Sequence, residues 1–146
     1  MTIRNYKSLD KSALLDIFKL NIPKYFDPSE LADLEKYLQK HASTYYTVVQ
    51  NTEIIGGFGF IINENQTGSI TWIFFSPNHT GSGSGTKAVQ FCHKHMREKF
   101  GVTNFSVRTS QHANLFFERF GYTTTHIENN YWGEGLDLYE MKCMVV

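Results

Sequence analysis

The sequence predicts an α+β fold, or an α/β arrangement, built around a mixed sheet, and three observations support this. Three segments rich in β-branched and aromatic residues follow one another with only short polar turns between them. Helical patterns precede and follow that group of strands. In the second half, strand and helix patterns alternate. The predicted order is ααβββαβαββ.

The first forty residues predict two helices. Apolar residues share one face within residues 11–20, and Pro23 prevents that helix from continuing. The second helix begins around Asp27-Pro28-Ser29-Glu30. Asp27 can cap it, and Glu30 can reach back to complete a capping box. Leucines then recur at spacings of three and four.

Three strands are expected next, at residues 44–50, 53–62 and 69–77. The short turns between them imply an antiparallel meander. Glycines at positions 56, 57 and 59 weaken the middle strand intrinsically, so a bulge or a close backbone approach is expected there.

The second half predicts a helix, a strand, a short helix and two final strands. Their expected ranges are 84–99, 102–110, 112–120, 122–131 and 136–145. Gly121 is a typical cap for the end of the short helix. The sequence contains neither an internal repeat nor a boundary linker, so we expect residues 1–146 to form a single domain.

Composition limits the classes of function. The 146 residues are 41% hydrophobic, enough to bury a core, and 14 basic residues balance 14 acidic ones. A neutral chain lacks the positive excess typical of nucleic-acid or membrane-surface binding, so neither partner is expected. Two cysteines are too few for a disulfide framework. The N-terminus has no signal-peptide pattern, and we expect a cytoplasmic monomer or homodimer.

The most informative segment is the glycine-rich turn between the strand at 69–77 and the helix at 84–99. Glycines alternate with other residues at Gly81, Gly83 and Gly85. The first turn of a helix carries unpaired N–H groups and the positive end of the helix dipole, and glycines let an anion approach them closely. The turn therefore predicts a phosphate or pyrophosphate site.

Two common phosphate-binding motifs fit this turn poorly. A P-loop requires G-x-x-x-x-G-K-[ST], whereas the chain reads Gly85-Thr86-Lys87-Ala88. The segment Gly83–Ala88 satisfies the dinucleotide pattern G-x-G-x-x-A, but no acidic residue lies on the next strand to hold a ribose.

Two segments together resemble the GNAT N-acetyltransferase superfamily. One is Pro77-Asn78-His79-Thr80-Gly81-Ser82-Gly83-Ser84-Gly85, which is similar to the family's strand–Pro–[Arg/Gln]-x-x-Gly-x-[Gly/Ala]–helix motif. The other, Ser110–Tyr122, is similar to the family's Asn-x-x-Ala-x-x-hydrophobic-Tyr-Glu-Lys-x-Gly-Phe signature. The order of elements is similar over nearly the whole chain.

The resemblance implies a mostly antiparallel, twisted sheet with a parallel central pair of strands that splay apart at the cofactor site. It also implies acetyl-coenzyme A as co-substrate. The pyrophosphate would lie on residues 80–85 and the pantetheine arm along the preceding strand. The implied cofactor-binding residues are Phe74, Phe75, Ser76, Thr80, Gly81, Ser82, Gly83, Ser84, Gly85, Thr86, Ser110, Ala113, Phe116 and Phe117.

Three positions depart from the family pattern. Thr80 replaces the family's Arg or Gln, and Ser110 replaces its Asn. Phe117 occupies the position of the tyrosine that often protonates the departing thiolate, and a phenyl ring cannot donate a proton. The departures imply weaker cofactor contacts and either a slower enzyme, a substitute proton donor such as Tyr131 or Tyr139, or a lost activity.

The base that accepts a proton from the amine has to be sought away from the strand at 69–77, which contains no carboxylate. The candidates lie near the final hairpin, where acids and aromatic residues combine in a way that suits a cationic amine. These candidates for the base or acid are His126, Glu128, Tyr131, Glu134 and Asp137.

Two functions are compatible with these features. The first is N-acetyl transfer to a primary amine of a small molecule or peptide by direct attack on acetyl-coenzyme A. The second is a non-catalytic domain that binds or senses acyl-coenzyme A, suggested by the phenylalanine at position 117. His93 and His95 point to different faces of their helix, and no metal site is expected.

Overall fold

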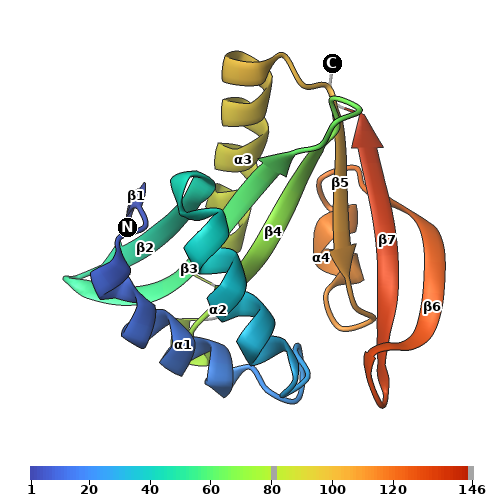
Figure 1. Cartoon of the computed structure of the whole chain (residues 1–146). Helices are drawn as coiled ribbons and strands as arrows, with labels where there is room; N and C mark the ends of the chain where they lie inside the picture. Colours follow the sequence, from blue (N-terminus) through green and yellow to red (C-terminus); the bar gives the residue numbers. More distant parts are fainter. Residues whose placement is uncertain (80–81, 145–146) are drawn as a thin grey trace.

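The computed structural model describes residues 1–79 and 82–144. Within these ranges the chain forms a seven-stranded sheet in the order β1-β2-β3-β4-β5-β7-β6 (Figure 1). The strands are β1 (Thr2–Asn5), β2 (Tyr45–Gln50), β3 (Glu53–Ile62), β4 (Gly68–Phe75), β5 (Asn104–Thr109), β6 (Thr123–Gly133) and β7 (Leu136–Met144). The helices are α1 (Lys11–Leu20), α2 (Glu30–Lys40), α3 (Ser84–Phe100) and α4 (Asn114–Glu118), with 3-10 turns η1 (Ser8–Asp10), η2 (Ala42–Thr44) and η3 (Pro77–His79).

The direction of the strands confirms the predicted mixed, mostly antiparallel sheet. Every neighbouring pair is antiparallel except β4 and β5. This parallel pair is short, with only Gly68, Ser69 and Ile70 of β4 in register with β5. Because α3 connects the two strands, the chain crosses over one face of the sheet between them.

Strand β1 is an addition to the predicted order, which began with two helices. It pairs antiparallel with the edge of β2, from Thr2 opposite Val49 to Asn5 opposite Tyr46. Its four residues show no clear alternation, so their strand form depends on the pairing with β2 rather than on local pattern. The predicted strand at 69–77 ends earlier, at Phe75, and Pro77 begins a 3-10 turn.

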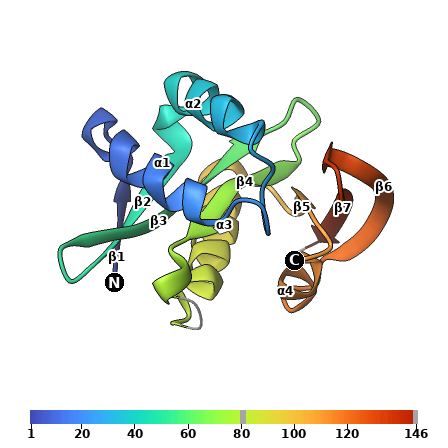
Figure 2. The same ribbon diagram turned by 90° about the horizontal axis from the view of Figure 1, so that it is seen from below.

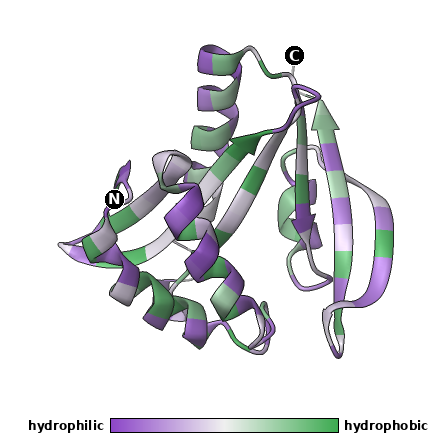
Figure 3. Cartoon of the chain, viewed as in Figure 1, coloured by the Kyte–Doolittle hydropathy of each residue, from purple (hydrophilic) through white to green (hydrophobic). Residues whose placement is uncertain are grey.

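Helices cover both faces of the sheet, with α1 and α2 on one face and α3 on the other (Figure 2). The first core contains Leu14, Phe18, Leu34, Leu38 and Phe74, and the second includes the predicted α3 face of Ala88, Val89, Cys92 and Met96. Polar and apolar residues alternate along these helices (Figure 3), as expected when one side packs on a sheet. Among the described helices, none is both long and apolar enough to cross a bilayer.

The cap predicted for the second helix is present. The backbone N–H of Asp27 donates to Oε2 of Glu30 at 2.8 Å, and the Asp27 carboxylate accepts from the N–H of Ser29 at 3.0 Å. Regular α-helix begins at Glu30 itself. The cap therefore fixes the side chain of Glu30 beside the segment that joins α1 to α2.

A partly buried ion pair attaches β1 to the start of α1. Both terminal nitrogens of Arg4 donate to the Asp10 carboxylate, at 2.7 and 2.9 Å, and Thr47 Oγ1 and the Lys7 N–H also donate to it. The Arg4 guanidinium, chiefly through these hydrogen bonds, lowers the pKa of Asp10 to about 2. Ionised Asp10 therefore stabilises the folded state above its ordinary pKa.

We expect Asp10→Asn to lower the free energy of unfolding by about 2 kcal/mol at pH 7. The folded-state pKa lies below the unfolded one, so this contribution is complete above about pH 4 and decreases as the pH falls towards about 2. Urea denaturation at pH 7 and pH 2.5 measures it, with Asp16→Asn on exposed α1 surface as control. An equal difference from wild type at both pH values would contradict this role.

Candidate active site

A deep cleft opens where β4 and β5 separate. The two strands pair only as far as Ile70 and Val107, and beyond that point they diverge (Figure 1). The cleft has a volume of about 1000 Å³ and is lined by the α1–α2 segment, β4, the start of α3, the end of β5 and α4. The divergence confirms the expected splay of the central parallel pair.

A bulge in β4 shapes one wall of the cleft. Gly57 pairs with Phe74 and Gly59 with Thr71, so Trp72 and Ile73 together lie opposite one residue of β3. Trp72 has a φ of 44°, an unusual value for a residue with a bulky side chain. The Tyr45 hydroxyl donates to the carbonyl of Trp72 at 2.8 Å and holds it there. The predicted bulge is present, and β4 carries the extra residue.

The bulge matters because it takes part of β4 out of regular pairing. A bulged residue is unpaired in the ladder, and strained backbone of this kind is often found beside functional sites. On its other side, this part of β4 faces the gap left by β5 and not a neighbouring strand. Its main chain can therefore pair with an extended ligand in the cleft.

The glycine-rich turn lies at one end of the cleft, where α3 begins. Gly83 precedes the helix with a φ of 83°, and a Cβ there would meet no atom within 4 Å. Ser82 and Ser84 share a hydrogen bond between their hydroxyls at 2.8 Å. Free helix N–H groups beside open space suit an anion. Thr80 and Gly81, which belong to the predicted site, lie outside the described residues.

Most of the residues expected to hold the cofactor line this one cleft. They are Phe74, Phe75, Ser82, Gly83, Ser84, Gly85, Thr86, Ser110, Ala113, Phe116 and Phe117. Ser76 is not among the lining residues, because it is buried and its N–H donates to the Ile55 carbonyl at 2.7 Å. Residues far apart in the sequence are thus brought together on opposite walls.

Phe117 lies in the cleft wall and is only 2% exposed. Its ring packs edge-on against Phe116 and Tyr122, with centroid separations of 5.1 and 5.7 Å. The ring therefore belongs both to the core beneath α4 and to the cleft. Ser110, also in the wall, accepts a hydrogen bond from the N–H of His112 at 3.3 Å.

The carboxylate and histidine candidates of the final hairpin are not among the cleft-lining residues. His126 and Glu128 lie 3.7 Å apart on the exposed edge strand β6. Asp137 accepts a hydrogen bond from the N–H of Asn130 at 2.9 Å, which holds the hairpin, and Glu134 is exposed in its turn. All four side chains therefore lie on the hairpin and outside the lining of the cleft.

The tyrosine candidates occupy the same hairpin. Tyr131 accepts a hydrogen bond from Arg108 at 2.6 Å, and its ring lies under that guanidinium. Neither Tyr131 nor Tyr139 is among the residues that line the cleft. The neighbouring Trp132 does line it, and its indole N–H donates to the Thr109 carbonyl at 3.1 Å.

Glu30 is the cleft residue that sequence reasoning missed. It is the single carboxylate among the described residues that line the cleft, and it is 6% exposed. Burial, above all, raises the pKa of Glu30 to about 7, and the charges of Asp27 and Asp33 also raise it against the opposing hydrogen bond from the Asp27 N–H. Among the described residues no hydrogen bond reaches its other oxygen, Oε1.

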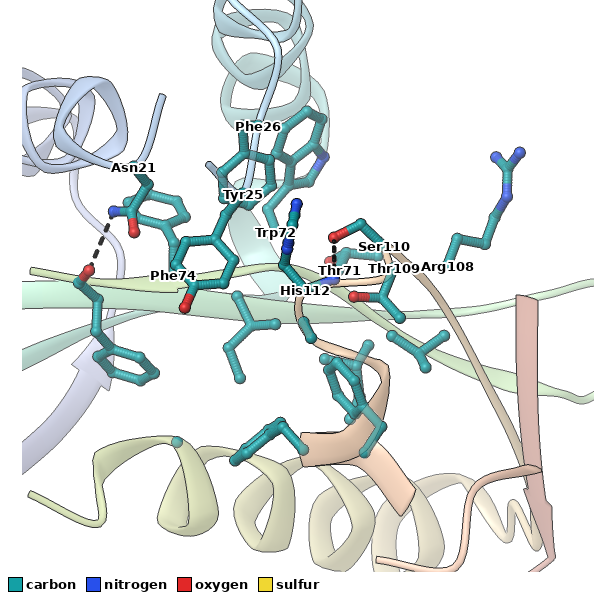
Figure 4. A pocket seen from close by; sticks show the side chains of 18 of the residues that line it. Asn21, Tyr25, Phe26, Thr71, Trp72, Phe74, Arg108, Thr109, Ser110 and His112 are labelled. Carbon is teal, nitrogen blue, oxygen red and sulfur yellow. Dashed lines mark hydrogen bonds between the residues drawn. The ribbon is translucent and has the colours of Figure 1, made fainter. Parts of the chain in front are cut away.

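A cluster of aromatic rings lines the cleft where the α1–α2 segment forms its wall. Tyr25, Phe26, Trp72 and His112 lie together in Figure 4, and Phe26 stacks on Trp72 with centroids 6.2 Å apart. His112 is exposed and meets Tyr25 edge-on at 6.4 Å. Among the described residues, no group of three or more His, Cys, Asp or Glu side chains is placed so that it could hold a metal ion.

Comparisons with known proteins agree with this geometry. The model of the Acetyltransferase (GNAT) family matches residues 12–122. A search of curated proteins gave no match.

Among solved structures, the chain is similar to Ard1 from Thermoplasma volcanium, with a TM-score of 0.84 and 14% identity over 99% of this chain and 97% of that one. It is similar to the ribosomal-protein-S18-alanine N-acetyltransferase from Escherichia coli, with a TM-score of 0.82 and 15% identity over 99% of this chain and 93% of that one. It is also similar to an aminoglycoside 6'-N-acetyltransferase complexed with coenzyme A, with a TM-score of 0.79 and 16% identity over 100% of this chain and 98% of that one. At these identities the likeness concerns the fold.

Proposed function

The chain belongs to the acetyltransferase (GNAT) family of acyltransferase enzymes, and we propose that it transfers an acetyl group from acetyl-coenzyme A to a primary amine of a small molecule or peptide. One observation carries the proposal. A single cleft is lined both by the open, glycine-led start of α3, which suits an anion, and by a buried carboxylate.

The donor end of the cleft fits coenzyme A chemistry. Gly83 and Ser84 present the start of α3 to the pyrophosphate, and the bulged strand offers main-chain groups to the amide-bearing pantetheine arm. Bound acetyl-coenzyme A supplies a thioester, whose C–S bond breaks as the amine forms its new bond to carbon. The departing thiol is a tolerable leaving group because its pKa is about 8.5.

Glu30 is the group we propose to accept the proton that the amine loses. The amine has to be neutral to attack, and an efficient base has a pKa near the working pH. With its pKa raised to about 7, Glu30 is largely ionised above that pH yet basic enough to take a proton. The hydrogen bond from the Asp27 N–H leaves Oε1 for this task.

The thiolate leaves without help from Phe117, because a phenyl ring has no proton to give. We therefore expect Phe117→Tyr to raise kcat by up to about 10²-fold, the lower range of what a positioned acid contributes. The substitution adds one oxygen to a ring that already lines the cleft. Steady-state kinetics at pH 7 and thermal melting on the same variant measure the effect.

Phe120→Tyr is the matched control for this substitution. It adds the same oxygen close by in sequence, outside the cleft lining. A buried hydroxyl without a partner costs about 1–3 kcal/mol. A lower melting temperature with no gain in kcat for Phe117→Tyr would mean that its ring tip points into the core.

The function is tested by following release of the free coenzyme A thiol from acetyl-coenzyme A in the presence of single amines at pH 8. Amine-dependent thiol release, with the acetylated amine identified by mass spectrometry, is the expected result. Tight binding of acetyl-coenzyme A without turnover on any amine would instead favour a domain that senses acyl-coenzyme A.

A further inference from the structure

The acceptor end of the cleft is walled mainly by aromatic rings. Trp72 packs against both Phe26 and Tyr37, in each case with ring centroids 6.2 Å apart. Glu30 and Tyr37 are seven residues apart on α2, which places them on the same helix face two turns apart. The carboxylate and the rings therefore share one wall (Figure 4 shows Phe26 and Trp72).

The charges around the cleft are few and unevenly placed. Glu30 provides one negative charge at working pH, whereas two arginines line the part of the cleft formed by β5 and α4: Arg119, and Arg108, which is paired with Glu140 at 3.7 Å. Burial raises the pKa of Tyr37 to about 12, so its hydroxyl stays neutral. A ligand with several positive charges would find one counter-charge and, in Arg119, one like charge without a carboxylate partner among the described residues. A ligand with a single ammonium group suits the site better.

The rim beside Glu30 is closed by a contact between two segments. A Cβ on Gly133 would overlap Oδ1 of Asp27, so the end of β6 touches the start of the Glu30 cap. Trp132, the residue before Gly133, lines the cleft just inside this contact. A peptide chain, whose backbone continues in an extended form from its first residues, would have to separate these two segments. A compact molecule would not.

We propose that the acceptor is a small amine with one positive charge and an aromatic body, of the arylalkylamine type. Its ammonium group pairs with Glu30 and its ring lies among Phe26, Tyr37 and Trp72. Aromatic faces favour both a neighbouring cation and a stacked ring. This inference rests on the proposed function, since it names the substrate class for the same cleft.

The binding test uses calorimetry and does not depend on turnover. The probe 2-phenylethylamine is titrated into the protein at pH 8, where Glu30 is ionised, and compared with its uncharged isostere 2-phenylethanol and with the polyamine spermidine. We expect both comparison compounds to bind at least about 10-fold more weakly, in keeping with the loss of one ion pair or one ring contact. Glu30→Gln should weaken 2-phenylethylamine binding to a similar degree.

Glu35→Gln is the matched control, because it removes a carboxylate from the same helix at a half-exposed position outside the cleft, where Glu35 pairs with Lys11. Phe26→Leu, which keeps an apolar side chain, should weaken the binding of 2-phenylethylamine more than the binding of n-butylamine. Equal or tighter binding of spermidine or of the tetrapeptide Ala-Gly-Ser-Ala would overturn the proposal. So would unchanged binding of 2-phenylethylamine to Glu30→Gln.

Acetylation kinetics on the same compounds separate this inference from the proposed function. Preference for 2-phenylethylamine in kcat/KM by at least about 10-fold over spermidine and the tetrapeptide supports both. Turnover of all amines without that preference leaves the function standing and refutes the substrate class. Glu30-dependent binding of 2-phenylethylamine with no acetylation of any amine supports the binding site and refutes the transfer reaction.

Discussion

Gly83→Glu is expected to lower the affinity for acetyl-coenzyme A by more than about 10²-fold while the chain stays folded. The new carboxylate would enter the open space in front of the first turn of α3, where a Cβ meets no atom within 4 Å. Like charges about 4 Å apart near a protein surface repel by about 4 kcal/mol, which exceeds a hundredfold change in affinity. Calorimetric titration with acetyl-coenzyme A measures the loss.

Two controls separate charge from backbone strain. Gly83→Gln adds nearly the same bulk without charge, so the further loss of affinity in Gly83→Glu beyond that in Gly83→Gln measures the effect of the charge. Gly101→Glu imposes comparable strain at the other end of the same helix, since Gly101 has a φ of 66° and equally open surroundings. We expect it to lower the melting temperature as Gly83→Glu does and to leave binding unchanged. Unaltered affinity for acetyl-coenzyme A in folded Gly83→Glu would contradict the assignment of the pyrophosphate site to the start of α3.

Much of the fold could be predicted because its elements carry strong local signals. The α3 face that contains Ala88 and Cys92 follows helical spacing, and the strands at β2, β3 and β4 are rich in β-branched and aromatic residues. Strand β1 carries no such signal. It exists because it completes the edge of β2 and is attached by Arg4 to Asp10, both of which are tertiary effects.

The two ends of the cleft differ in how far the sequence could reveal them. The donor end depends on a contiguous turn with Gly83 at its centre, so it could be recognised from local pattern. The acceptor end joins Glu30, Trp72 and Trp132, which are brought together only by the sheet. Acids and aromatic residues close together in the final hairpin suggested a base there, yet the strands direct those acids to the surface.

Glu30 has two roles, of which only the helix cap could be predicted from the sequence. Its place three residues after Asp27 indicated a helix cap, and that hydrogen bond is present at 2.8 Å. The cap explains why a carboxylate is there, but it does not reveal that the side chain is also buried in the cleft wall. The raised pKa could have been anticipated only by knowing that the fold buries this first turn of α2 in the wall of the cleft.

Glu30→Gln is expected to reduce kcat/KM for amine acetylation by about 10²–10⁴-fold at pH 8, the range typical for loss of a general base. The amide keeps an oxygen that can accept from the Asp27 N–H, so the cap should persist. In the wild type, kcat/KM should rise with pH as Glu30 ionises around pH 7, and this limb should disappear in the variant. Glu35→Gln, on the same helix, should keep both the rate and the pH profile.

The same substitution should stabilise the protein in a way that depends on pH. The folded-state pKa of Glu30, about 7, lies above its usual 4.5, so between these values the folded state holds a proton that the unfolded state has lost. Ionised Glu30 therefore destabilises the fold progressively as pH rises from about 4.5 to 7, by about 3 kcal/mol in full. Glu30→Gln removes this cost, and its melting temperature should exceed that of wild type at pH 8 but not at pH 4.5. A variant that loses activity together with stability at pH 8 would mean that Glu30 serves the fold and not the proton transfer.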